Sequence, residues 1–319
     1  MLRALLLYLS TATWARRLVT KWSVAWRVAS RFVAGETLDD AVRVTRELNA
    51  RGLLVTLDHL GELTTNPAEA EQATQELIRI VRTIEAEDLR AGISLKLTQL
   101  GLALDEALAA QHLRQILQVA EPLGIFVRID MEDSRWVDAT WRLFDQMWHE
   151  GFRLVGVVLQ AYLYRSEGDL QRLARYPARV RLVKGAYKEP PEIAYPRKRD
   201  VNAAYDRLAR QLLTIAREAG APPVSEDGRV PPIPAIATHD EARIAYAQEQ
   251  AERLGLPKPA VEFQMLYGIR RDLQMRLAQA GYPVRIYVPY GTEWYPYFMR
   301  RLAERPANLA FFLRHLFRG

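Results

Sequence analysis

Short apolar runs rich in β-branched residues recur along this chain, and most of them precede a stretch whose apolar residues repeat every three or four positions. The runs predict strands, and the stretches predict helices. Eight runs fit this description: residues 53–57, 93–97, 125–129, 155–159, 180–183, 235–238, 261–265 and 284–288. The helical stretches are residues 67–90, 105–122, 135–149, 201–219 and 240–254. Eight strands that alternate with helices predict an α/β fold, a TIM-type (β/α)8 barrel.

The composition fits one such barrel and excludes several kinds of chemistry. A length of 319 residues is normal for a single (β/α)8 domain, and 49% hydrophobic residues are sufficient for a large core. The absence of cysteine excludes disulfides, thiolate metal sites and a cysteine nucleophile, and it is consistent with a reducing compartment. A net charge of +6 leaves phosphate-rich partners and anionic membrane surfaces open.

Two segments lie outside the alternating pattern. In residues 14–32, apolar positions three and four apart are separated by basic residues, which predicts an amphipathic helical arm over residues 1–35 ahead of a barrel domain over 36–319. Two interpretations of the arm stay open: packing on its own domain, or contact with an anionic membrane. The proline-rich segment 221–234 predicts a flexible surface loop.

Polar residues follow nearly every predicted strand. In (β/α)8 barrels the chemistry lies at the carboxyl ends of the strands. The residues there are Asp58, His59, Lys96, Asp130, Gln160, Lys184, Thr238, His239, Gln264 and Tyr287. Lys96 lies within an apolar alternation, and Arg181 and Lys184 belong to one strand. Three cations around one mouth would repel each other, so we expect a negative group to bind between them.

A cluster of aromatic residues and two adjacent arginines lies near the end of the chain, in YVPYGTEWYPYFMRRLAERP (287–306). Pro296 suits the first turn of a helix, where its missing N–H costs nothing. Such a helix would place Tyr297, Arg300, Arg301 and Glu304 on one face. The residues alone leave two interpretations open: a surface Arg–Glu pair, or a pair of arginines that binds a carboxylate.

Other routes to function lack support in the sequence. No GxGxxG follows a strand, and no GxxxxGK[ST], GxSxG or HExxH motif occurs. The histidine spacing predicts no metal site. The small-residue turn at 184–186 could bring backbone N–H groups close to a phosphate. Redox chemistry with an organic cofactor and acid–base chemistry both stay open.

Seven motifs together resemble the proline dehydrogenase family of flavin-dependent enzymes, in its monofunctional bacterial form. They are ISLKLTQLG (93–101), VRIDMED (127–133), VVLQAYLYR (157–165), VRLVKGAY (180–187), ATHD (237–240), EFQMLYGIR (262–270) and RIYVPYGTEWYPYFMRRLAERP (285–306). The motifs occur in barrel order and cover most of residues 50–310.

The resemblance implies a distorted (β/α)8 barrel that holds FAD at its mouth. L-Proline would be oxidised to 1-pyrroline-5-carboxylate by hydride transfer from C5 to flavin N5, and a membrane quinone would reoxidise the flavin. A separate pyrroline-5-carboxylate dehydrogenase would act next in proline catabolism. The expected location is the cytoplasm, with peripheral contact to the inner face of the cell membrane, and no nucleic-acid partner is expected.

The resemblance also implies roles for individual residues. Asp130 would lie beside the substrate and the flavin, and Arg181 would donate towards flavin N5. Substrate binding would fall to Lys96, Arg300 and Arg301 at the carboxylate and to Tyr287 and Tyr297 around the ring, with Glu304 orienting the arginines. The positions that match FAD contacts are Met131, Gln160, Lys184, Gly185, Ala186, Thr238 and His239.

Two alternatives have specific motives. A barrel flavoprotein of the methylenetetrahydrofolate reductase type would share the architecture, but the arginine pair beside Tyr297 favours a small amino acid as substrate. A nucleic-acid-binding protein would account for the positive charge. The basic residues are dispersed, however, and no nucleic-acid-binding motif occurs.

Overall fold

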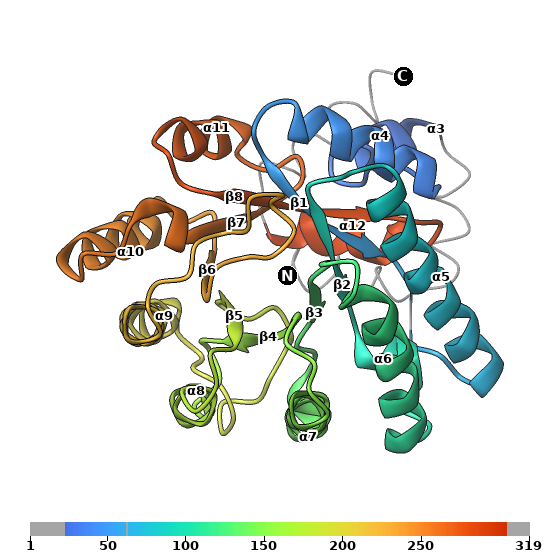
Figure 1. Ribbon diagram of the computed structural model, residues 1–319, viewed down its shortest axis with the longest axis horizontal. Helices are drawn as coiled ribbons and strands as arrows, with labels where there is room; N and C mark the ends of the chain where they lie inside the picture. The colour runs from blue at the N-terminus through green and yellow to red at the C-terminus, as the bar shows by residue number, and fades with distance from the viewer. Residues whose placement is uncertain (1–22, 62, 305–319) are drawn as a thin grey trace.

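Eight parallel strands close into one barrel in the order of the chain (Figure 1). The structure is a computed structural model that describes residues 23–61 and 63–304. The strands are β1 (Leu54–His59), β2 (Ala91–Leu95), β3 (Val127–Ile129), β4 (Val155–Gln160), β5 (Arg179–Val183), β6 (Pro234–Ala237), β7 (Glu262–Leu266) and β8 (Val284–Tyr290). β8 pairs with β1 and closes the barrel. The predicted fold is confirmed, and each predicted strand lies within two residues of its observed bounds.

Helices surround the strands in the described part of the chain (Figure 1). The five predicted helices are confirmed as α5 (Pro67–Ala86), α6 (Glu106–Ala120), α7 (Val137–His149), α9 (Lys198–Glu218) and α10 (Glu241–Arg253). The alternation also implied helices after β4 and β7, which are α8 (Ser166–Leu173) and α11 (Arg271–Gln279). Sequence reasoning made no prediction for α4 (Leu38–Asn49) or for the short 3-10 helices η1 (Leu97–Leu100), η2 (Ser134–Trp136) and η3 (Lys258–Ala260). α5 ends before residue 90 because Asp88 has φ +45°, which turns the chain towards β2.

Local signals explain where the helices begin. Asn66 caps α5 by accepting a hydrogen bond from Glu69 N, and Pro67 occupies the first helical position. Asp105 caps α6 in the same way through Leu108 N. The apolar faces of these helices then pack on the outside of the strands, where Ile80, Ile84 and their neighbours form one large core.

The segment 221–233 is a loop, as predicted, but the expectation that all of it lies at the surface was wrong. Gly228 and Arg229 are buried in it at the amino-terminal end of the barrel. Gly228 O accepts a hydrogen bond from Arg285 Nη2 (2.9 Å), and Arg229 donates to Leu89 O (3.3 Å). Polar composition indicated a loop, but it could not reveal that the loop's arginine and carbonyls satisfy buried polar groups of the barrel.

A second, smaller core joins α3 (Ser23–Ala29) to α12 (Trp294–Glu304). The rings of Phe32 and Phe298 lie 6.4 Å apart, and Val33 is fully buried beside them. Pro296 lies in the first turn of α12, which begins two residues earlier than predicted. Within the predicted arm, residues 1–22 lie outside the described residues. Val28, Phe32 and Val33 are buried against α12, so they do not face a membrane.

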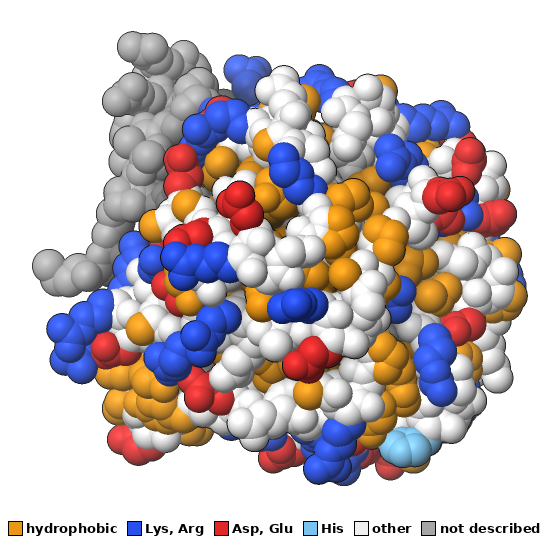
Figure 2. Space-filling model, turned by 60° about the vertical axis from the view of Figure 1, so that its left-hand side comes forward, with side chains coloured by type: hydrophobic (Ala, Val, Ile, Leu, Met, Phe, Trp, Pro, Cys, Tyr) orange, Lys and Arg blue, Asp and Glu red, His pale blue; other side chains and the backbone are white. Residues whose placement is uncertain are grey.

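The outer surface carries charges of both signs. Figure 2 shows Lys and Arg side chains interspersed with Asp and Glu on the face that it presents. Many charged side chains on the described surface form exposed ion pairs, such as Arg142 with Glu106 and Arg207 with Glu167. None of the helices within the described ranges is both long and apolar enough to span a membrane.

We expect Arg285→Met to destabilise the fold far more than Arg253→Met does, although both remove an Arg–Glu pair. Arg285 and Glu262 are buried in the barrel, and their Nε and Oε1 atoms lie 2.9 Å apart. Removing one partner leaves a buried charge, which costs about 3–5 kcal/mol. The Arg253–Glu249 pair is exposed, so its loss should cost less than about 0.5 kcal/mol. Denaturant unfolding measures both values, and equal losses would contradict the packing described.

Candidate active site

A largely buried hydrogen-bonded cluster centred on Arg181 lies inside the barrel near the carboxyl ends of the strands. Its Nη1 donates to Asp130 Oδ1 (2.6 Å) and its Nη2 donates to Ser94 Oγ (3.1 Å). Tyr287 donates to the second oxygen of Asp130 (2.7 Å), and Gln264 accepts from Arg181 Nε. Alternate residues of a strand point to the same face, so β2, β5, β7 and β8 each direct a side chain inward at this level. The structure therefore brings Asp130, Arg181 and Tyr287 into direct contact.

Lys96 follows β2 and reaches the same mouth. Its Nζ donates to Asp58 Oδ1 at 3.2 Å, and Asp58 is 1% exposed. Burial lowers the pKa of Lys96, but the carboxylates of Asp58 and Asp130 outweigh that effect and raise it above the usual value. Lys96 is therefore an ammonium at neutral pH.

The expectation that the three cations require an external anion was wrong, because the protein supplies a carboxylate to each. Lys96 pairs with Asp58 and Arg181 with Asp130. Lys184 donates to Asp240 Oδ2 (2.6 Å) and Asn202 Oδ1 (2.7 Å). A fourth cation, Arg300 on α12, differs from these three. It is exposed and forms no ion pair with the side chains that the structure describes.

α12 brings the predicted arginine pair to the mouth. The Arg301 guanidinium lies 5.0 Å from the centre of the Tyr297 ring, which is itself buried. Burial and the carboxylate of Glu132 raise the pKa of Tyr187 to about 12, whereas the cations of Lys96 and Arg300 act against that rise. The side chain of Glu304 lies outside the described part of the structure.

The positions predicted to contact FAD lie at the ends of four neighbouring strands. Met131, Gln160, Lys184, Gly185, Ala186, Thr238 and His239 follow or end β3, β4, β5 and β6. Gln160 Nε2 donates to Glu132 O (2.8 Å), and His239 Nε2 accepts from Leu266 N (3.0 Å). These bonds join neighbouring loops into a continuous rim. The positions predicted to contact FAD therefore share one side of the mouth.

Gly185 has a structural reason to be glycine. Its φ is +115°, and a Cβ there would lie 2.1 Å from the Tyr162 ring. A Gly185→Val variant would therefore disturb this turn with or without a bound phosphate, so loss of flavin in that variant cannot by itself place a phosphate here.

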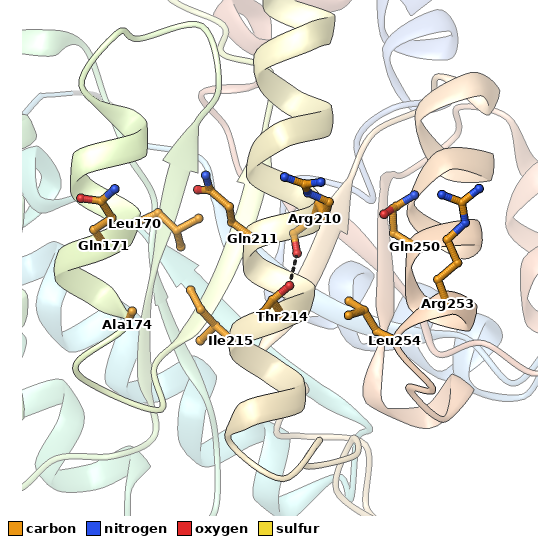
Figure 3. A pocket seen from close by; sticks show the side chains of 10 residues that line it. All are labelled: Leu170, Gln171, Ala174, Arg210, Gln211, Thr214, Ile215, Gln250, Arg253 and Leu254. Atoms are coloured by element: carbon orange, nitrogen blue, oxygen red, sulfur yellow. Dashed lines mark hydrogen bonds between the residues drawn. The ribbon is translucent and has the colours of Figure 1, made fainter.

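A well-formed groove lies away from the barrel mouth. It has a volume of about 520 Å³ and runs between α8, α9 and α10 on the outer helices (Figure 3). Leu170, Ile215 and Leu254 form its apolar lining, and its polar side chains include Gln171, Gln211 and Gln250. None of the predicted site residues lines this groove, so the candidate site is the barrel mouth.

Sequence reasoning missed two members of the site. Ser94 lies two residues before Lys96, and residues two apart on a strand share a face, so this spacing could have identified Ser94 as a neighbour of the site. Tyr187 ends the motif VRLVKGAY, but nothing in its local sequence indicates that the loop after β5 reaches the loop after β3, where Ser134 donates to Glu189. Within the ranges described, no three metal-binding side chains cluster.

Comparison with known proteins gives the family. A family model described as proline dehydrogenase matches residues 41–314. Proline dehydrogenase 1 of Bacillus subtilis is 41% identical over 317 residues, which are 98% of each chain. Proline dehydrogenase of Deinococcus radiodurans is 40% identical over 298 residues, covering 92% of this chain and 91% of the relative.

A solved structure agrees with these relatives. The crystal structure of proline utilization A (PutA) from Bdellovibrio bacteriovorus inactivated by N-propargylglycine has a TM-score of 0.79 and 27% identity, covering 88% of this chain and 33% of that one. The chain belongs to the proline dehydrogenase family and is an enzyme, as its motifs indicated. Neither the methylenetetrahydrofolate reductase type nor a nucleic-acid-binding protein is supported.

We expect Asp240→Asn to lower stability near neutral pH by a margin that shrinks in acid. Burial raises the pKa of Asp240, but Lys184 outweighs that effect and holds it below the usual 3.8. A carboxyl group whose pKa is lower in the folded state stabilises the fold above its unfolded pKa. That contribution is lost as the pH falls through the folded pKa. Asparagine remains a good helix cap, so the cap of α10 is retained.

Denaturant unfolding at a series of acidic pH values tests this expectation. The difference from wild type should be full above about pH 5 and should narrow as the pH falls below the usual aspartate range. Asn202→Leu is the matched control, because it removes the uncharged acceptor of Lys184 and leaves Asp240 to titrate in both proteins. The stability difference between Asn202→Leu and wild type should therefore not change with pH. If the difference for Asp240→Asn does not change with pH either, the role of this ion pair is contradicted.

Proposed function

We propose that the protein is an FAD-dependent L-proline dehydrogenase that forms 1-pyrroline-5-carboxylate. The observation that carries this proposal is the arrangement of charges at the mouth. The Arg181–Asp130–Tyr287 cluster lies at the centre, the Lys96 ammonium is held beside it by Asp58, and Arg301 of α12 lies over the ring of Tyr297. A small ligand with one carboxylate and one ring fits between such cations and the neighbouring tyrosines.

The carboxylate of proline is proposed to bind Lys96, Arg300 and Arg301. The two arginines offer planar donor forks, and Lys96 adds a compact charge from the end of β2. Tyr287 and Tyr297 pack around the ring, and both side chains are held by neighbouring groups: Tyr287 by Asp130 and Tyr297 by the Arg301 guanidinium. This arrangement fixes the orientation of the ring before any bond changes.

The residues proposed to hold FAD are Met131, Gln160, Lys184, Gly185, Ala186, Thr238 and His239. When bound, FAD supplies the acceptor for the hydride that leaves proline C5. Arg181 presents a fixed positive charge at the inner end of this rim, and Asp130 keeps the guanidinium in place. The amine of proline must be neutral when the hydride leaves, so binding of the neutral amine is part of the proposal.

A membrane quinone is proposed as the final oxidant, with a separate pyrroline-5-carboxylate dehydrogenase acting on the product. Support comes from the resemblance of the motifs and from the basic residues of the N-terminal arm. We propose a cytoplasmic enzyme that contacts the inner face of the membrane peripherally through this arm. A truncation to test this contact should remove only residues 1–22, because Val28 and Val33 belong to the core under α12.

We expect Arg300→Met and Arg301→Met to lose most activity with proline. Removing one charge-assisted donor from a carboxylate costs on the order of 2–5 kcal/mol, which is roughly a 30-fold to several-thousand-fold loss in kcat/KM. Arg301→Lys should also be impaired, because an ammonium does not reproduce the planar fork. Flavin content should stay near wild type, since neither residue is proposed to hold FAD.

Arg276→Met is the matched control, because Arg276 is an exposed helical arginine paired with Glu241 on the outer layer. Steady-state kinetics with proline and a soluble quinone analogue, together with melting temperatures, should separate the variants. Near-normal kcat/KM in both α12 variants would contradict the assignment of the carboxylate site. A surface role would instead appear as a small loss of stability with unchanged kinetics.

A further inference from the structure

The side chain of Gln99 joins the ends of β1 and β2. Its Oε1 accepts a hydrogen bond from Lys96 N (3.1 Å). Its Nε2 donates to His59 O (3.1 Å) and Gly61 O (3.3 Å). Gln99 is 4% exposed, so its amide is withdrawn from water and uses its acceptor and both donors within the protein.

These bonds continue the sheet past the point where the strands end. The pairing of β1 with β2 stops at Asp58 and Ser94, and β2 ends at Leu95, so the backbone at His59 and Lys96 lies beyond the ladder. Buried backbone groups need partners, and here one side-chain amide satisfies the N–H of Lys96 and the carbonyl of His59. One bonded residue, Lys96, is itself a member of the ion pair with Asp58, and the other, His59, directly follows Asp58 in the chain.

Gln99 belongs to the short helix η1, and further hydrogen bonds connect η1 to neighbouring loops and helices. Thr64 N and Oγ1 both donate to Thr98 O, which ties the loop after β1 to η1. Thr98 in turn donates to Glu132 through its backbone N and its hydroxyl (3.2 and 2.7 Å), which ties η1 to the loop after β3. At its far end, Leu100 O lies 2.9 Å from His112 Nδ1. The backbone N–H of Gln99 also donates to Lys96 O (3.1 Å), and among the side chains that form these hydrogen bonds the Gln99 amide is the one that bonds the Lys96 N–H.

We propose that Gln99 is a positioning residue for substrate binding, which acts by fixing the Lys96 ammonium relative to Asp58 and to the mouth. This inference rests on the proposed role of Lys96 at the substrate carboxylate. Without the amide, the Lys96 N–H and the His59 carbonyl lose their partner. The chain can then rotate at the residue whose ammonium must meet the carboxylate. The consequence is weaker binding of substrates that carry a carboxylate, with the chemical step itself preserved.

The test compares L-proline with pyrrolidine, the same ring without the carboxylate. We expect Gln99→Leu to raise KM for proline about 10-fold, the effect of leaving a buried polar group without its partner, and to change kcat less than about two-fold. Reaction with pyrrolidine should be unchanged, because Lys96 has no carboxylate to bind there. Combined with Lys96→Met, Gln99→Leu should add almost nothing, since two residues that act through one contact are not additive.

Two further variants keep the test decisive. Gly61→Ala pushes on the same amide, because its Cβ would lie 2.9 Å from Gln99 Nε2, and it should weaken proline binding in the same direction if Gln99→Leu does not fold. His112→Leu loosens the other end of η1 and should lower the melting temperature without changing KM. An equal rise in KM for His112→Leu, or equal losses with proline and pyrrolidine for Gln99→Leu, would overturn the inference.

The outcomes also separate this inference from the proposed function. Impaired proline binding in Lys96→Met with normal kinetics in Gln99→Leu and Gly61→Ala would overturn the role of Gln99 alone. Normal proline kinetics in Lys96→Met would overturn the carboxylate role of Lys96 and the role of Gln99 with it.

Discussion

The ion pair between Arg181 and Asp130 organises the inside of the barrel. Two charges removed from water each carry a desolvation penalty of several kcal/mol, which their attraction offsets only if the remaining donors and acceptors are satisfied. Ser94, Gln264 and Tyr287 supply those partners from β2, β7 and β8. The pair therefore requires strands on several sides of the barrel to be in register, and it converts the fold into a site of fixed charge.

The residues at the mouth are positioned in two different ways. The ends of β1 to β8 place Lys96, Asp130, Arg181 and Tyr287 through a closed sheet. The arginines of α12 are placed differently, because α12 packs on α3 through Phe298, Trp294 and their partners. Trp294 Nε1 also donates to Glu36 Oε1 (3.0 Å), which joins α12 to the segment before α4. The amino-terminal part of the described chain thus helps to position the proposed carboxylate-binding arginines.

The sequence predicted the strands well because each strand is a short apolar run bounded by polar residues. It also predicted which residues lie at the mouth, since strand ends face one side of the barrel. It did not predict their partners. The pairing of Lys184 with Asp240 joins β5 to the residue before α10, and that depends on side-chain directions across two strands. The burial of Arg229 in a proline-rich loop and the contact of Glu189, after β5, with Ser134, after β3, are likewise tertiary effects that local composition does not contain.

The central claim is that this mouth holds a flavin and presents proline to it. The most direct test is to mix the purified protein with L-proline in the absence of oxygen and to follow the visible absorbance. The account predicts an oxidised flavin spectrum before mixing, its bleaching by L-proline, and about one pyrroline product for each flavin reduced. A protein without flavin, or a bound flavin that L-proline leaves oxidised, would contradict it.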